Sequence, residues 1–126
     1  MPLNAQELKQ LAEAAEQSPL PVCGNWVHRA AAWESFTEDR WPAGLMQRVD
    51  TLRADEFTEP SFEEFHPGGT RYDSADAPVS VPHFPVNRSE LVRCPACARL
   101  VLRYTEFGGY YVDHRARRVE AALVSV

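Results

Sequence analysis

The chain has 126 residues, of which 44% are hydrophobic and 25% charged, a composition typical of one folded domain and not of a disordered chain. No apolar run approaches the roughly 18–20 residues that a membrane-spanning helix needs. The acidic N-terminus lacks the basic start and the apolar core of a signal peptide. We therefore expect a single domain, 1–126, in the cytoplasm, with reduced thiols and no membrane partner.

The formal net charge of −5 is unevenly distributed along the chain. Residues 1–66 contain 12 acidic and 5 basic residues, whereas residues 67–126 contain 6 acidic and 8 basic residues. The acidic half is densest at Asp55, Glu56, Glu59, Glu63 and Glu64. This segment is either a solvated loop or a surface for a basic partner, since charge of one sign accelerates association. Direct contact with nucleic acid is not expected there.

The first predicted element is a helix over residues 5–17. Asn4 and Glu7 form a capping-box pattern at its start. Apolar residues follow at helical spacing, namely Leu8, Leu11, Ala12 and Ala15. The run Ser18-Pro19-Leu20-Pro21 then ends the helix. The chain is thus divided into an N-terminal helix (1–18), a linker (19–22) and a β-rich body (23–126).

Strands are predicted through most of the body. Residues 23–36 weakly favour a strand, residues 45–53 favour one more clearly, and residues 66–88 form a long, proline-rich loop that lies across a sheet. The segments 91–94, 100–107 and 110–119 are the clearest strands, and Gly108-Gly109 is a two-residue hairpin turn. The predicted fold class is α+β, with the N-terminal helix followed by a mainly antiparallel β-sheet and a C-terminal β-hairpin.

Cys94 and Cys97 have the spacing of a zinc knuckle, which needs two further ligands. Pairing across the predicted turn places His114 opposite Arg103, about 20 Å from Cys97 at roughly 3.3 Å per residue, which is too far. The remaining candidates are Cys23, His28, His66 and His83, all on distant segments. A redox pair is disfavoured because a strand follows and not a helix start. We expect a turn with free thiols and no cofactor, with zinc as the alternative, and Cys23 as a small buried apolar residue.

Enzymatic chemistry is not indicated by any motif of the sequence. Neither a nucleophile elbow nor a glycine-rich phosphate loop occurs. Glu63, Glu64 and His66 could form an acid–base cluster, but adjacent residues of an extended chain point opposite ways. His83 is interpreted as a packing residue. We therefore expect the chain not to be an enzyme, and a small enzyme around His66 is the least favoured hypothesis.

The predicted C-terminal hairpin has one face that mixes tyrosines, arginines and acids. Tyr104, Tyr111 and Arg115 lie on this face, and tyrosine and arginine are enriched in interface hot spots. A sheet face half-covered by the proline-rich segment is an equally good interpretation. The basic run 115–118 is divided between the two faces, and its arginines are expected to pair with Asp113 or Glu106.

Several blocks of the sequence resemble a group of small bacterial proteins: "RVDTLR", "EFHPGGTRY", "DAPVSVPHFPVNR", "CPACARLVLRYTEFGGYYVDHRAR" and "ALV". The resemblance covers about residues 24–124, and "YTEFGGYYVDHR" is its most specific part. Proteins of this group are similar to immunity proteins of polymorphic or contact-dependent toxin systems. The group pattern has cysteine at the position of Ser89 and glycine at the position of Ala98.

The resemblance and the acidic charge together suggest a non-enzymatic binding protein. The leading hypothesis is an immunity protein that neutralises a cognate basic toxin domain, such as a nuclease, by blocking its active site. The expected contact residues are Asp55, Glu56, Glu59, Glu63 and Glu64, followed by Tyr104, Tyr111 and Arg115. The alternative is a zinc-ribbon-like module, with Cys94 and Cys97 as ligands, that docks on protein or nucleic acid.

Overall fold

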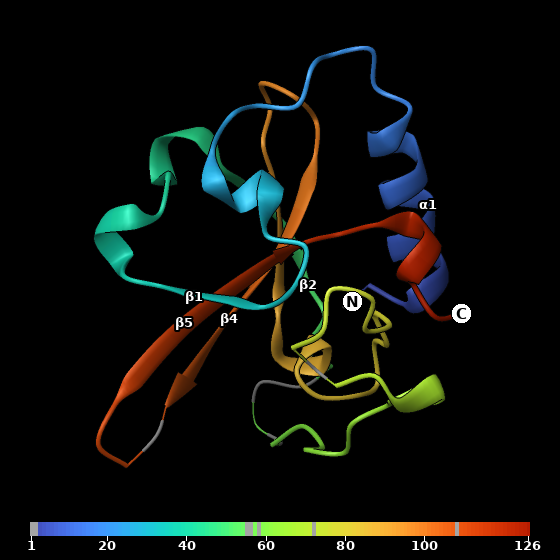
Figure 1. Ribbon diagram of the computed structural model, residues 1–126, viewed down its shortest axis with the longest axis vertical. Coiled ribbons are helices and arrows are strands. Elements are labelled where there is room, and N and C mark those ends of the chain that lie inside the picture. Colours follow the sequence, from blue (N-terminus) through green and yellow to red (C-terminus); the bar gives the residue numbers. More distant parts are fainter. Residues whose placement is uncertain (1–2, 55–56, 58, 72, 108) are drawn as a thin grey trace.

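The computed structural model describes residues 3–54, 57, 59–71, 73–107 and 109–126. An N-terminal helix, α1 (Ala5–Glu16), precedes a five-stranded antiparallel sheet, and the predicted α+β class is confirmed (Figure 1). The strands lie in the order β1-β5-β4-β3-β2. Their bounds are β1 (Glu34–Phe36), β2 (Gln47–Thr51), β3 (Glu90–Arg93), β4 (Leu100–Phe107) and β5 (Val112–Arg118). Among the described residues, no helix is long and apolar enough to cross a bilayer.

Helix α1 forms as predicted and ends one residue earlier. The Asn4 side chain accepts a hydrogen bond from the Glu7 amide at 2.8 Å, and the Glu7 carboxylate accepts one from the Asn4 amide at 3.1 Å. Leu8, Ala12 and Ala15 are buried, whereas Leu11 is 37% exposed. The helix therefore packs on the sheet through a narrow stripe of mainly small side chains.

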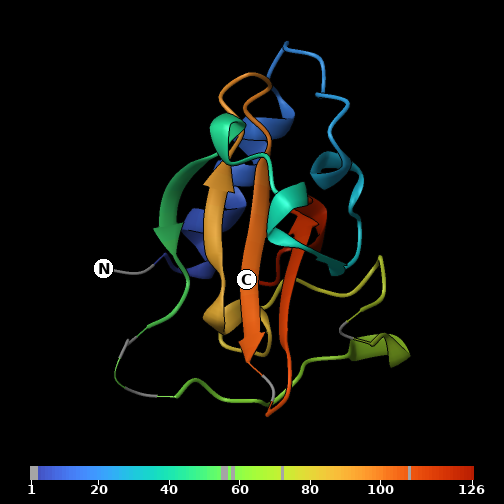
Figure 2. The same ribbon diagram turned by 90° about the vertical axis from the view of Figure 1, so that its left-hand side faces the viewer.

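Both faces of the sheet are packed, because successive residues of a strand point to opposite sides. Leu100, Leu102 and Tyr104 of β4 join the cluster that includes the buried stripe of α1. Val101 of β4 joins a second cluster, in which Val27 and Phe36 belong to the segment between α1 and β2. Figure 2 shows α1 behind the sheet and this segment in front of it.

The predicted register of the C-terminal hairpin is wrong by two residues. Phe107 pairs with Val112, and Thr105 pairs with His114, so four residues connect the strands in place of two. Gly108 lies outside the described residues. A shift of two residues keeps the alternation of side chains, so the predicted division of the hairpin into two faces is unaffected.

The weakly predicted strand over residues 23–36 is mostly wrong. A 3-10 helix occupies Trp26–Arg29, and only β1 at the end of the segment is a strand. The Asn25 side chain accepts a hydrogen bond from the Val27 amide at 3.3 Å and so caps this helix. The Asn25 cap, directly after Gly24, starts a helical turn. The aromatic and β-branched residues alone favour an extended strand at this position.

The proline-rich segment 66–88 is anchored by apolar side chains, as predicted. Val79 and Val86 are buried in the cluster beneath α1, and Val79 forms a parallel bridge with Val124. Tyr72, also expected to be buried, lies outside the described residues. This segment and the C-terminus thus close the α1 side of the sheet.

Candidate metal centre

The turn that joins β3 to β4 brings two thiols to the same side of the chain. The amides of Cys97 and Ala98 both donate to the Cys94 carbonyl, at 3.3 and 2.7 Å, and the Cys94 amide donates to the Arg99 carbonyl at 3.0 Å. Ala98 has a φ of +64°, the left-handed conformation in which zinc knuckles often have glycine. The predicted turn at Cys-Pro-Ala-Cys is therefore present, with both cysteines buried.

Two further ligand atoms reach this turn from the segment after α1. Cys23 follows the linker, and His28 lies on the 3-10 helix Trp26–Arg29. The Arg118 amide donates to the Ala30 carbonyl at 2.8 Å, and this bond holds the segment against the end of β5. His28 is only 5% exposed, and Cys23 is partly exposed.

The four side chains form a cluster with the dimensions of a tetrahedral metal site. The sulfur atoms of Cys23 and Cys94 are 3.8 Å apart, and His28 Nε2 lies 3.7 Å from Cys97 Sγ. The ligand atoms of all four residues lie within 4.8 Å of one another. Zn–S bonds of about 2.3 Å and Zn–N bonds of about 2.0–2.1 Å in a tetrahedron imply separations of about 3.5–3.8 Å between ligand atoms. A shift of less than about 1 Å would complete the site.

The thiols of the cluster differ in their acidity. Burial opposes ionisation of Cys97, but hydrogen bonds from the backbone amides of Cys23 and Arg99 outweigh it, so the pKa of Cys97 lies below its ordinary value. The hydrogen bond between the thiols of Cys23 and Cys97 is the main cause that raises the pKa of Cys23 to about 11. Desolvation and the hydrogen bond to Cys94 raise this pKa further. The thiols of Cys97 and Cys23 thus differ in acidity, and Cys97 ionises before Cys23.

His28 is held in the neutral form that a metal ligand requires. Burial and then the positive charge of Arg99 lower its pKa. Its Nδ1 atom is buried and has no hydrogen-bond partner among the described residues, while Nε2 faces the sulfur atoms. A nearly buried imidazole directed at three thiols fits a ligand of a bound cation better than a packing residue.

Arg99 joins the two halves of the cluster from outside. Its guanidinium donates to the Cys97 carbonyl at 2.7 Å and to the Leu20 carbonyl at 3.3 Å. Three thiolates and one Zn²⁺ carry a net charge of −1, and a neighbouring cation compensates that charge. Arg99 thus lies outside the four candidate ligands and connects residues 19–22 to the cysteine turn.

The sequence analysis preferred a turn with free thiols at Cys94 and Cys97, with zinc as the alternative. Cys94 and Cys97 were recognised from their spacing, and Cys23 and His28 were two of four candidates for the missing ligands. His83 packs elsewhere: its Nδ1 is 2.6 Å from Ser80 Oγ, and its ring stacks on Phe65. His66 Nε2 lies 2.5 Å from a Glu64 carboxylate oxygen, also outside the cluster.

The acidic residues expected to contact a partner are only partly described. Asp55 and Glu56 lie outside the described residues. Glu59 pairs with Arg88 at 3.0 Å, and Glu64 contacts His66, whereas Glu63 is simply exposed. The contact between Glu64 and His66 joins two residues of the acid–base cluster that the sequence analysis disfavoured.

The aromatic and basic residues of the hairpin have different environments. Tyr104 is 3% exposed and packs edge-to-face on Trp33, so its expected place on a contact surface is wrong. Its strand face is covered by α1 and the proline-rich segment. Tyr111 is 56% exposed. Arg115 pairs with Asp113 at 2.7 Å and with Glu106 at 3.3 Å, as predicted.

No family model matches this chain, and no match to it was found among curated proteins or solved structures. The resemblance to the group of bacterial proteins therefore stays a prediction.

Proposed function

We propose that this chain is a docking protein, in which Cys23, His28, Cys94 and Cys97 hold one structural Zn²⁺ and another part of the surface binds a partner. The observation that supports this is the convergence of four ligand atoms, from segments far apart in the sequence, within 4.8 Å of one another. Three sulfurs and one imidazole are the donor set that zinc prefers in structural sites. The proposal favours the zinc-containing docking module over a turn with free thiols.

A structural role follows from the number and the burial of the ligands. Catalytic zinc sites have three protein ligands and leave one position for water or substrate, whereas structural sites are closed by four. Here four protein ligands are at hand, and three of them are buried. Zinc would therefore join the segment after α1 to the β3–β4 turn, and any partner would bind elsewhere on the surface.

The first test is the metal content of the protein, purified with a non-thiol reductant and without added chelator. We expect about one zinc per chain by elemental analysis and a lower melting temperature after chelation. Absence of metal together with an unchanged melt would overturn the proposal. The reductant matters because Cys23 and Cys94 are close enough to oxidise during purification.

The ligand set is tested by measuring how tightly Co²⁺ binds to the wild-type chain and to the variants Cys23→Ser and His28→Gln. Tetrahedral thiolate coordination gives Co²⁺ intense visible absorption together with thiolate charge-transfer bands in the near ultraviolet. We expect both variants to bind more weakly by over about 100-fold, beyond the usual effect of losing an outer-shell partner. His66→Gln is the matched control, because His66 contacts Glu64 and not the cluster. Wild-type affinity in His28→Gln would remove that residue from the set.

The immunity-protein hypothesis is a second proposal for the same binding role. The exposed carboxylate of Glu63 and the 63% exposed side chain of Glu59 support it, since they can reach a basic partner. Replacing Glu59, Glu63 and Glu64 with lysine is expected to slow association with the cognate toxin domain and to reduce the salt sensitivity of that rate. An unchanged association rate would contradict this contact surface.

A further inference from the structure

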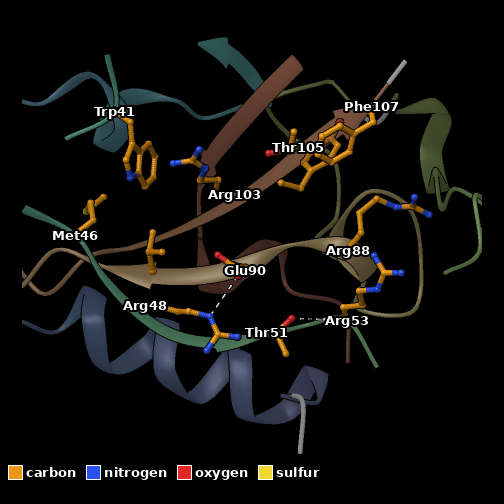
Figure 3. Close-up of a pocket in the computed structure, with 12 residues that line it drawn as sticks. Trp41, Met46, Arg48, Thr51, Arg53, Arg88, Glu90, Arg103, Thr105 and Phe107 are labelled. Carbon is orange, nitrogen blue, oxygen red and sulfur yellow. Dashed lines mark hydrogen bonds and ion pairs between the residues drawn. The ribbon is translucent and has the colours of Figure 1, made fainter. Parts of the chain in front are cut away.

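A groove of about 570 Å³ crosses the sheet on the side opposite α1. Its wall runs from Trp41 and Met46 at one end to Phe107 at the other (Figure 3). Four arginines and one acid are among its lining residues: Arg48, Arg53, Arg88, Arg103 and Glu90. The groove is thus locally basic although the chain has a formal net charge of −5.

Two of these guanidinium groups are held in place by aromatic rings. The Arg88 guanidinium lies 4.2 Å from the centroid of the Phe62 ring and also donates to the Pro60 carbonyl at 2.9 Å. The Arg103 guanidinium lies 4.5 Å from the centroid of the Trp41 ring. Their side chains are 12% and 18% exposed. Such fixed, planar groups lose little side-chain freedom when they bind a carboxylate. On Arg88 that carboxylate would accept from Nη1, which now donates to Glu59, because Nη2 already donates to the Pro60 and Ser61 carbonyls.

The carboxylates that these arginines bind within the chain are exposed by comparison. Glu59, the partner of Arg88, is 63% exposed, and Glu38, the partner of Arg103, is 58% exposed. Water solvates these exposed carboxylates well once they leave the arginines, so releasing them costs little free energy. Ligand carboxylates can therefore replace these acids on arginines that stay in position.

We propose that this groove binds an acidic, extended segment of a partner protein, with two or three carboxylates on the arginines. The exposed ring of Phe107 offers an apolar contact at the end of the groove, next to the exposed hairpin residues Tyr110 and Tyr111. Carboxylate is the chemistry already bound by Arg48, Arg88 and Arg103 in this fold. Nucleic acid offers phosphate in place of carboxylate, and the experiment below distinguishes the two. The surface is separate from the zinc cluster, so this inference goes beyond the proposed function.

The probe is a fluorescein-labelled decapeptide of alternating glutamate and glycine with one central tyrosine, measured by fluorescence anisotropy on the whole chain at low salt. We expect saturable binding, a loss of roughly three- to tenfold in affinity for Arg48→Ala, and no change for Arg71→Ala, whose side chain lies outside the groove. A decapeptide with glutamine in place of glutamate should not bind. Equal binding of both peptides, or absence of binding, would overturn the proposal.

The decisive variant removes an internal competitor. Glu59→Gln frees Arg88, so the acidic peptide should bind roughly three- to fivefold more tightly. Glu13→Gln makes the same change of net charge on an exposed position of α1 and should have a much smaller effect. Equal gains in both variants would mean that only net charge matters and would contradict a defined groove. Preferential binding of a ten-nucleotide single-stranded DNA would overturn the assignment to a protein partner.

Discussion

Ala98 adopts a backbone conformation that costs an alanine about 1–2 kcal/mol. Its φ of +64° turns the chain back after the two cysteines, so that the Cys94 amide can donate to the Arg99 carbonyl at 3.0 Å. Glycine adopts this conformation without steric cost, although its unfolded state has more conformational freedom. Ala98 thus lowers the stability of the turn that carries two of the proposed ligands.

We therefore expect Ala98→Gly to raise the free energy of unfolding by up to about 1 kcal/mol, measured by urea denaturation. Ala14→Gly on the exposed side of α1 is the matched control and should lower it by about 1 kcal/mol. If both substitutions lowered stability equally, the left-handed conformation of Ala98 would be contradicted.

Arg117 is a second residue whose environment is unfavourable. It is 1% exposed, its guanidinium donates to the Ala77 carbonyl at 3.1 Å, and its Nε has no partner among the described residues. Burial lowers its pKa, and the charge of Glu120 opposes this only in part. A buried cation with this little compensation is costly.

Replacing Arg117 with methionine should leave stability unchanged or raise it by about 1 kcal/mol, because the desolvation cost disappears while volume is retained. Arg117→Ala should lower stability by about 2–3 kcal/mol, since it leaves a cavity between the sheet and the covering segment. Chemical denaturation of the two variants distinguishes these effects. A loss on methionine substitution as large as that on alanine would show that the guanidinium itself is required.

At the scale of single elements, α1 depends on one large side chain. Leu8 is fully buried, whereas Leu11 is 37% exposed, although both lie on the predicted apolar stripe. Leu8→Ala should lower the free energy of unfolding by about 3 kcal/mol, and Leu11→Ala by less than about 1 kcal/mol. Both variants replace leucine with alanine in the same helix and differ only in burial. A similar loss of stability in both would therefore contradict the orientation of α1.

The elements that the sequence predicted well are those whose signals are local. The capping box and the apolar spacing of α1 depend on residues within one or two turns. Strand β4 combines apolar and β-forming residues and is followed directly by the Gly108-Gly109 turn signal. The strand predicted over residues 23–36 is mostly wrong because the aromatic residues there favour a strand, whereas the Asn25 cap starts a 3-10 helix. The hairpin register was wrong because Gly108-Gly109 fits a two-residue turn as well as part of a longer one.

The cysteine–histidine cluster shows the same limit at the level of a site. Cys94 and Cys97 share one turn, so their spacing alone placed them together. Cys23 and His28 converge with them through tertiary contacts, among them the hydrogen bond from the Arg118 amide to the Ala30 carbonyl. Neither composition nor periodicity separates these two residues from His66 and His83, because that choice depends on tertiary contacts.

At the scale of the whole molecule, the cluster joins the periphery to the sheet. We expect chelation to accelerate amide hydrogen exchange in residues 19–30 and in the β3–β4 turn, measured by mass spectrometry. Peptides from the hydrogen-bonded centre of β4 and β5 should keep most of their protection, because their ladder does not involve the ligands. Uniform loss of protection would instead make the metal essential for the entire fold.

The convergence of Cys23 with Cys94 also has a consequence for the chain before it folds. The two residues are 71 positions apart, and a bond through zinc would close a loop of that length. In a chain-entropy description, such a cross-link would destabilise the unfolded ensemble by about 4 kcal/mol, more than a short local staple does. The turn at Cys94 and Cys97 can capture the ion first as a chelate, and Cys23 and His28 then join it. Zinc would thus also determine the order in which distant parts of the chain meet.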